Sequence, residues 1–92
     1  MSVLRKSLII KNERGLHARA SAKFVNAVSL LPQGIDVRIA REGNEASGGS
    51  ILGLMMLGAA KGDTVELIVS GDRVESIFDN LCGMIENGFG EE

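Results

Sequence analysis

The spacing of apolar residues changes several times along the 92-residue chain, and these changes limit the folds it can adopt. Over residues 3–10, 35–40 and 64–69, apolar side chains alternate with polar ones or run together, as they do in strands. Elsewhere they recur every three or four residues, which is the spacing of one helical face. Glycines and short polar breaks separate these stretches, so each stretch is a separate element.

Three segments have the helical spacing, at residues 18–31, 50–57 and 72–87. In the third, Asp72 is followed three residues later by Glu75, a pair that matches a capping box. We therefore expect the third helix to begin directly after Asp72.

A tight turn within residues 41–45 joins the strand at residues 35–40 to a further short strand at residues 45–47. The resulting order is β-α-β-β-α-β-α in a single domain covering residues 1–92. It predicts an α+β fold, in which helices cover one face of a four-stranded antiparallel sheet. Asp36, Arg38 and Glu66 would then lie on the opposite face, in water.

Composition excludes several classes of function. The net charge is −2 and the only aromatic residues are three phenylalanines, which argues against a nucleic-acid partner. Cys82 has no disulfide partner and fits a buried small side chain, and one cysteine with one histidine cannot build a structural zinc site. We identify neither a membrane-length apolar run nor a signal-peptide pattern, and with the unpaired cysteine this predicts a cytoplasmic protein without a membrane partner. We also expect a monomer without a metal.

The only histidine, His17, lies where the first helix begins. The first N–H groups of a helix lack intrahelical partners and carry the positive end of its dipole, which disfavours imidazolium and suits an anion. The backbone of Gly15, Ala18 and Ala20 would cradle a phosphoryl group, and the Arg19 guanidinium would bind its oxygens. The same spacing also fits a polar surface histidine with no chemical role, so position alone does not decide.

Two stretches resemble signatures of the HPr family, the histidine-containing phosphocarrier proteins of the phosphotransferase system. "GLHARASAKFV" resembles the active-site motif of the family. "SGGSILGLMMLGAAKGDTVEL" resembles its second signature, in which a serine opens a short helix ending in a Leu-Gly pair, here Ser50, Leu57 and Gly58. The family has the element order predicted above, arranged as an open-faced β-sandwich.

The resemblance implies a phosphoryl carrier rather than a stand-alone enzyme, without a cofactor. Enzyme I, phosphorylated from phosphoenolpyruvate, would transfer the group to Nδ1 of His17, with Arg19 stabilising it. The chain would then pass the group to an EIIA-type protein. The family usually has proline where this chain has Ala20. Alanine retains an N–H at this place, and it is a good helix former.

Two further expectations concern regulation and the branch of the system. Ser50 fits the N-cap of the short helix, and the resemblance implies that a serine kinase could phosphorylate it. "IENGFGEE" and "MMLGAAKG" resemble the carriers of the nitrogen-related regulatory branch, often called NPr, whereas "SILGLMMLG" is also common in the carriers of sugar transport. We expect the nitrogen-related branch, with sugar transport as the alternative.

The short helix carries more apolar residues than one face can hold. We expect Ile51 and Leu54 to face the core, and Leu52, Met55 and Met56 to form an exposed patch beside His17 for partner docking. The alternative is a helix buried on all sides.

Other residues receive simpler interpretations. Lys23 is expected mostly as a solvated residue of the first helix, and Glu91 and Glu92 as a solvated end. The same element order also describes a ferredoxin-like domain that binds a small regulatory ligand, in which His17 would be incidental. An RNA-binding domain of similar order is disfavoured by the composition.

Overall fold

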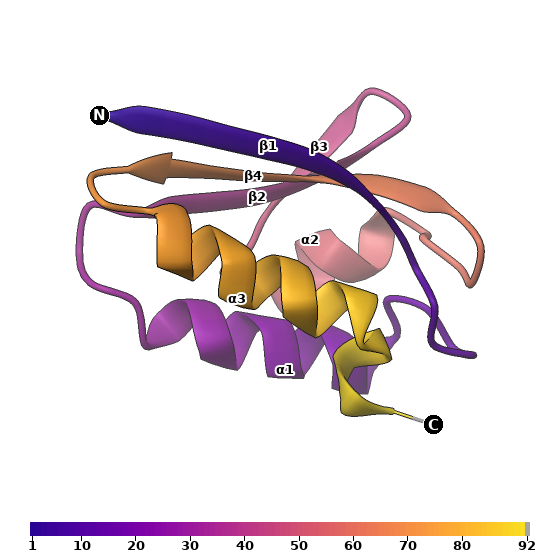
Figure 1. Ribbon diagram of the computed structural model, residues 1–92. Coiled ribbons are helices and arrows are strands. Elements are labelled where there is room, and N and C mark those ends of the chain that lie inside the picture. The colour runs from indigo at the N-terminus through magenta and orange to yellow at the C-terminus, as the bar shows by residue number, and fades with distance from the viewer. Residues whose placement is uncertain (92) are drawn as a thin grey trace.

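The protein is described by a computed structural model, which covers residues 1–91 (Figure 1). Its strands are β1 (Ser2–Ile9), β2 (Asp36–Arg41), β3 (Asn44–Ser47) and β4 (Thr64–Gly71). Its helices are α1 (Ala18–Ser29), α2 (Ile51–Met56) and α3 (Glu75–Glu86), followed by a short 3-10 helix, η1 (Gly88–Gly90). The predicted order of strands and helices is confirmed, and η1 is an addition that the apolar spacing did not indicate.

The four strands form one antiparallel sheet in the order β1-β4-β2-β3. Strand β4 lies between β1 and β2 and pairs with β1 from Ser2 opposite Gly71 to Ile9 opposite Thr64. Because β1 and β2 both run antiparallel to β4, they are parallel to each other, and α1 provides the crossover between them. All three helices cover the same face of the sheet (Figure 1), which confirms the open-faced α+β architecture.

The core lies between this sheet face and the helices. The alternating residues Val65, Leu67 and Val69 of β4 point into it and are buried, as the period of two predicts. Phe24 of α1 and Leu81 of α3 meet them from the helical side. On the opposite face the polar residues remain solvent-accessible: Asp36 and Arg38 are exposed and Glu66 is half-buried.

The predicted capping box at the start of α3 is wrong. The N-cap residue is Val74, which has no side-chain capping bond, while Asp72 is exposed to solvent. The reason lies in Arg73, whose φ of +55° turns the chain sharply between these two residues. Val74 is fully buried by this turn, so core packing rather than a polar cap fixes where the helix begins.

Helix α2 begins as predicted, with the Ser50 hydroxyl accepting a hydrogen bond from the N–H of Gly53 at 2.9 Å. Leu54 and Leu57 hold its C-terminal part against the core. Ile51 was expected in the core, but it is 41% exposed because the contact with the core lies nearer the other end of the helix.

The remaining apolar residues of α2 are at the surface. Leu52, Met55 and Met56 are 67%, 40% and 77% exposed, which rules out a helix buried on all sides. Together with Ile51 they form what we call the α2 patch. Helix α2, which carries this patch, packs against α1 and β3.

The loop between β1 and α1 is fixed to the segment that follows α2. The N–H of Leu16 donates to the carbonyl of Ala59 at 2.9 Å. Gly15 has a φ of +62°, and a Cβ atom added there would lie 2.8 Å from Cα of Ala60 and closer still to the Ala59 oxygen. Only glycine permits both this backbone conformation and this approach.

We predict that Gly15→Ala lowers the free energy of unfolding by about 2 to 4 kcal/mol, because backbone strain and a clash with main-chain atoms add together. Urea denaturation measures the loss. Gly34→Ala is the matched control, since Gly34 has a φ of +90° but nothing within 4 Å of the added Cβ. The control should lose only about 1 kcal/mol, and equal losses in the two variants would contradict the close approach.

Candidate functional site

His17 is the N-cap residue of α1 and faces the N-terminus of the helix. Its backbone is extended, and its Nδ1 accepts a long hydrogen bond, 3.4 Å, from the backbone N–H of Arg19. The first N–H group of the helix that donates to a backbone carbonyl is that of Ser21, which binds the carbonyl of His17 at 2.9 Å. Within residues 1–91, the N–H groups of Ala18 and Ala20 therefore have no carbonyl partner, and they lie in the first turn beside the imidazole.

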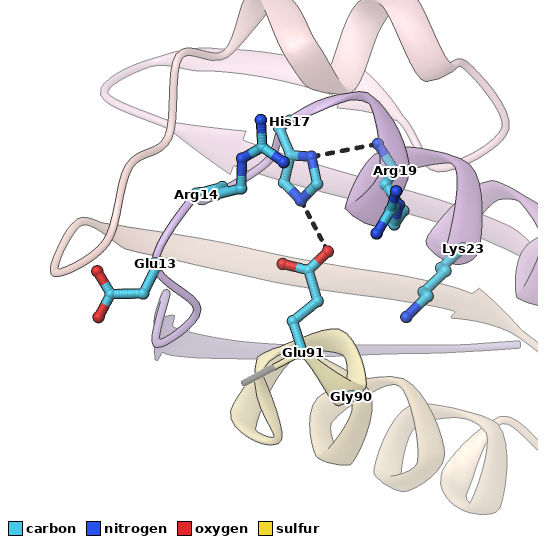
Figure 2. Close-up of a pocket in the computed structure, with 7 residues that line it drawn as sticks. All are labelled: Glu13, Arg14, His17, Arg19, Lys23, Gly90 and Glu91. Atoms are coloured by element: carbon cyan, nitrogen blue, oxygen red, sulfur yellow. Dashed lines mark hydrogen bonds and ion pairs between the residues drawn. The ribbon is translucent and has the colours of Figure 1, made fainter.

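His17 lines an open hollow of about 340 Å³, and Figure 2 shows the side chains around it. Around His17 it is lined by three cationic side chains, those of Arg14, Arg19 and Lys23, and by the carboxylates of Glu13 and Glu91. Within residues 1–91, neither arginine forms an ion pair. The hollow is therefore suited to a small anion, which guanidinium groups and helix N–H groups both bind well.

Glu91 also lines the hollow and meets the imidazole at Nε2, the nitrogen away from Arg19 (Figure 2). Its Oε2 lies 2.7 Å from Nε2 of His17, and its Oε1 accepts a hydrogen bond from Nδ2 of Asn12 at 3.0 Å. The hydrogen bond from Asn12 lowers the pKa of Glu91, and the contact with His17 and the charge of Lys23 act in the same direction against an opposing effect of burial. The expectation of a solvated end is wrong for Glu91, and Glu92 lies outside the described residues.

The other carboxylate of the hollow, Glu13, points away from the imidazole (Figure 2). It binds Nζ of Lys61 at 2.6 Å, and this hydrogen bond lowers the pKa of Glu13. Within residues 1–91, His, Cys, Asp and Glu side chains do not gather in any group of three or more that could hold a metal ion.

The structure brings most of the predicted site residues together. His17, Ala18, Arg19 and Ala20 share the first turn of α1. Gly15 is adjacent but plays a different part, since its N–H donates to Asn12 and its carbonyl accepts from Asn12 Nδ2 at 2.8 Å. The bond from Leu16 to Ala59 holds the segment that follows α2 beside the residue that precedes His17, and the residues of the α2 patch do not line the hollow itself.

Four contributors were missed or underestimated by sequence reasoning. Arg14 stands three residues before His17 and could have been found from its charge and proximity. Lys23 was treated as mostly solvated, yet its Nζ also donates to the carbonyl of Phe89 at 3.1 Å. Asn12 and Glu91 are linked to the site only by folding, and Glu91 stands 74 residues after His17.

Comparison with known proteins agrees with this geometry. The sequence model described as the PTS HPr component phosphorylation site matches residues 4–87. The phosphocarrier protein HPr of Cupriavidus necator is 40% identical over 90 residues, covering 97% of this chain and 98% of that protein. The phosphocarrier protein NPr of Shewanella violacea is 32% identical over 91 residues, covering 99% and 98%.

A solved structure gives the same result for the fold. The crystal structure of HPr-C-His from Thermoanaerobacter tengcongensis superposes with a TM-score of 0.86 at 35% identity, covering 97% of this chain and 98% of that one. With the family model spanning nearly the whole chain, the resemblance read from two short motifs is confirmed. The chain belongs to the HPr family, the phosphocarrier proteins of the phosphotransferase system.

Proposed function

We propose that this chain accepts a phosphoryl group from phosphorylated Enzyme I on Nδ1 of His17 and passes it to an EIIA-type protein. The observation that carries the proposal is the placement of Nδ1 at the N-terminus of α1, next to free N–H groups and an open cationic hollow. The imidazole supplies the nucleophile, while the Arg19 guanidinium and the N–H groups of Ala18 and Ala20 bind the phosphoryl oxygens. Arg14 adds a second guanidinium to this set.

We place the carrier in the nitrogen-related branch and in the cytoplasm. The stretches "IENGFGEE" and "MMLGAAKG" support this branch, and both HPr and NPr proteins are among the relatives. The sugar-transport branch is the alternative, favoured by "SILGLMMLG". No helix within residues 1–91 has the length and apolar character needed to cross a bilayer. Membership of the family removes the reason to treat His17 as incidental in a ferredoxin-like ligand-binding domain.

The α2 patch is the proposed docking surface for Enzyme I and the EIIA-type partner. Methionine side chains adapt to more than one partner surface, and the patch is exposed on the helix whose following segment is bonded to Leu16, next to His17 in the chain. Ser50 opens the same helix, so a phosphate added there by a serine kinase would put negative charge at the edge of the patch.

The function is tested by incubating the protein with Enzyme I and phosphoenolpyruvate. We predict one acid-labile phosphate on the wild type by intact mass and none on His17→Ala. Adding purified EIIA-type proteins of each branch then identifies the acceptor, and we predict faster transfer to the nitrogen-related one. A wild-type protein that takes up no phosphate would overturn the proposal, and faster transfer to the sugar-branch protein would overturn the assignment to a branch.

Leu52→Gln tests the docking surface. Removing a leucine that becomes buried on binding should raise KM for Enzyme I-dependent phosphorylation about tenfold, equivalent to about 1.4 kcal/mol. Leu30→Gln is the matched control, because Leu30 is 77% exposed at the far end of α1. Thermal unfolding should be nearly unchanged in both variants. Equal KM values for the two variants would show that Leu52 is not part of the docking surface for Enzyme I.

Ser50→Asp and Ser50→Asn separate charge from capping. Asp and Asn are both as good as Ser at an N-cap, so both variants should fold normally. We predict slower transfer from Enzyme I to Ser50→Asp and a nearly wild-type rate for Ser50→Asn, measured from the time course of phosphohistidine formation. Equal rates in the two variants would show that charge at this place does not regulate transfer.

A further inference from the structure

The C-terminal segment that carries Glu91 is held in a defined conformation. Gly88, Phe89 and Gly90 all have positive φ, of +63°, +58° and +75°. A left-handed conformation is costly for phenylalanine and persists only where the surroundings impose it. Phe89 is buried and packs edge-on against Phe24, with ring centroids 6.5 Å apart. Lys23 also binds the Phe89 carbonyl, so the chain leaves η1 in a fixed direction.

This conformation places the Glu91 carboxylate between two donors. One oxygen faces Nε2 of His17 at 2.7 Å, and the other accepts from Asn12 Nδ2, which is itself fixed by a second bond to the Gly15 carbonyl. The side chains of His17 and Glu91 are only 19% and 16% exposed, so water screens their interaction less than it would on an open surface.

The two contacts of the imidazole specify where its proton lies. An ionised carboxylate can only accept a hydrogen bond, so Nε2 must carry a hydrogen. The backbone N–H of Arg19 can only donate, so Nδ1 must present a lone pair. Together these contacts select the Nε2–H tautomer, with its lone pair on Nδ1, the nitrogen that faces the helix N-terminus.

We propose that Glu91 is a positioning residue for phosphoryl transfer, which holds His17 in the Nε2–H tautomer and stabilises the positive charge that forms on the ring. This inference rests on the proposed function, since it takes Nδ1 of His17 as the acceptor. Its role is that of the carboxylate in other carboxylate–imidazole pairs, which orients the ring and stabilises imidazolium without reacting itself.

The charge balance of the step explains why a carboxylate helps. The Nδ1 lone pair forms the new N–P bond, and the bond from phosphorus to the donor breaks and leaves its electron pair on the donor. The Nε2 hydrogen remains in place, so the ring becomes a phosphorylated imidazolium. Its positive charge lies against Glu91, and onward transfer returns the lone pair to Nδ1 and discharges the ring.

Glu91→Gln tests the proposal with little change in shape. Asn12 Nδ2 requires an acceptor, so it takes the single oxygen of the glutamine amide and leaves the NH₂ group facing Nε2. That arrangement favours a lone pair on Nε2 and a hydrogen on Nδ1, the wrong nitrogen for attack. We predict a shift to the Nδ1–H tautomer and a rate of transfer from Enzyme I that falls about tenfold or more.

The tautomer is read from the ¹⁵N chemical shifts of the imidazole in unphosphorylated, labelled protein, at a pH where the ring is neutral. Because the chain has one histidine, a single pair of ring signals is expected. Glu86→Gln is the control. It removes the same charge, but from a residue at the end of α3 that pairs with Lys6 at the surface. It should leave both the tautomer and the rate as in the wild type.

A wild-type ring in the Nδ1–H form would overturn the proposal, as would a Glu91→Gln variant that keeps the wild-type tautomer or the wild-type rate. The tautomer measurement requires no phosphate. It therefore shows where the proton lies even if His17 proves not to be the phosphoryl acceptor. A failure of the tautomer proposal can thus be distinguished from a failure of the proposed function.

Discussion

The antiparallel pairing of β1 with β4 determines where the site is assembled. The pairing continues beyond the strands, with Ile10 N–H bonded to the Asp63 carbonyl at 2.9 Å and Gly62 N–H bonded to the Ile10 carbonyl at 2.8 Å. The bond from Leu16 to Ala59 follows a few residues later. These backbone hydrogen bonds alone hold residues that are far apart in the chain next to each other. They place the start of α1 beside the segment that follows α2.

A carrier must bind its phosphoryl group firmly enough to receive it and weakly enough to release it. The geometry here suits that requirement, because the cations surround an open hollow rather than a closed cavity. Solvent reduces the attraction between a guanidinium and a phosphoryl oxygen there. The contact between Glu91 and Nε2 of His17 is more enclosed than the open hollow, since both side chains are largely buried.

Much of the fold and part of the site could be predicted from local patterns. Alternation in β4, the spacing around Phe24 and the place of His17 at a helix start are all properties of neighbouring residues. The errors arose where tertiary packing overrides a local signal: burial of Val74 displaces the expected Asp72 cap, and Ile51 lies beyond the edge of the core. Glu91 could not be assigned, since its contact with His17 depends on the left-handed turn at Phe89.

His17 has two roles that compete for the same nitrogen. Its Nδ1 is at once the proposed phosphoryl acceptor and the cap of α1, through the N–H of Arg19. Once the lone pair is committed to phosphorus, that N–H loses its partner, and the new phosphoryl oxygens are the acceptors within reach. Under the proposed function, the Arg19 N–H would therefore have an acceptor in both states, the Nδ1 lone pair in the unloaded carrier and a phosphoryl oxygen in the loaded one.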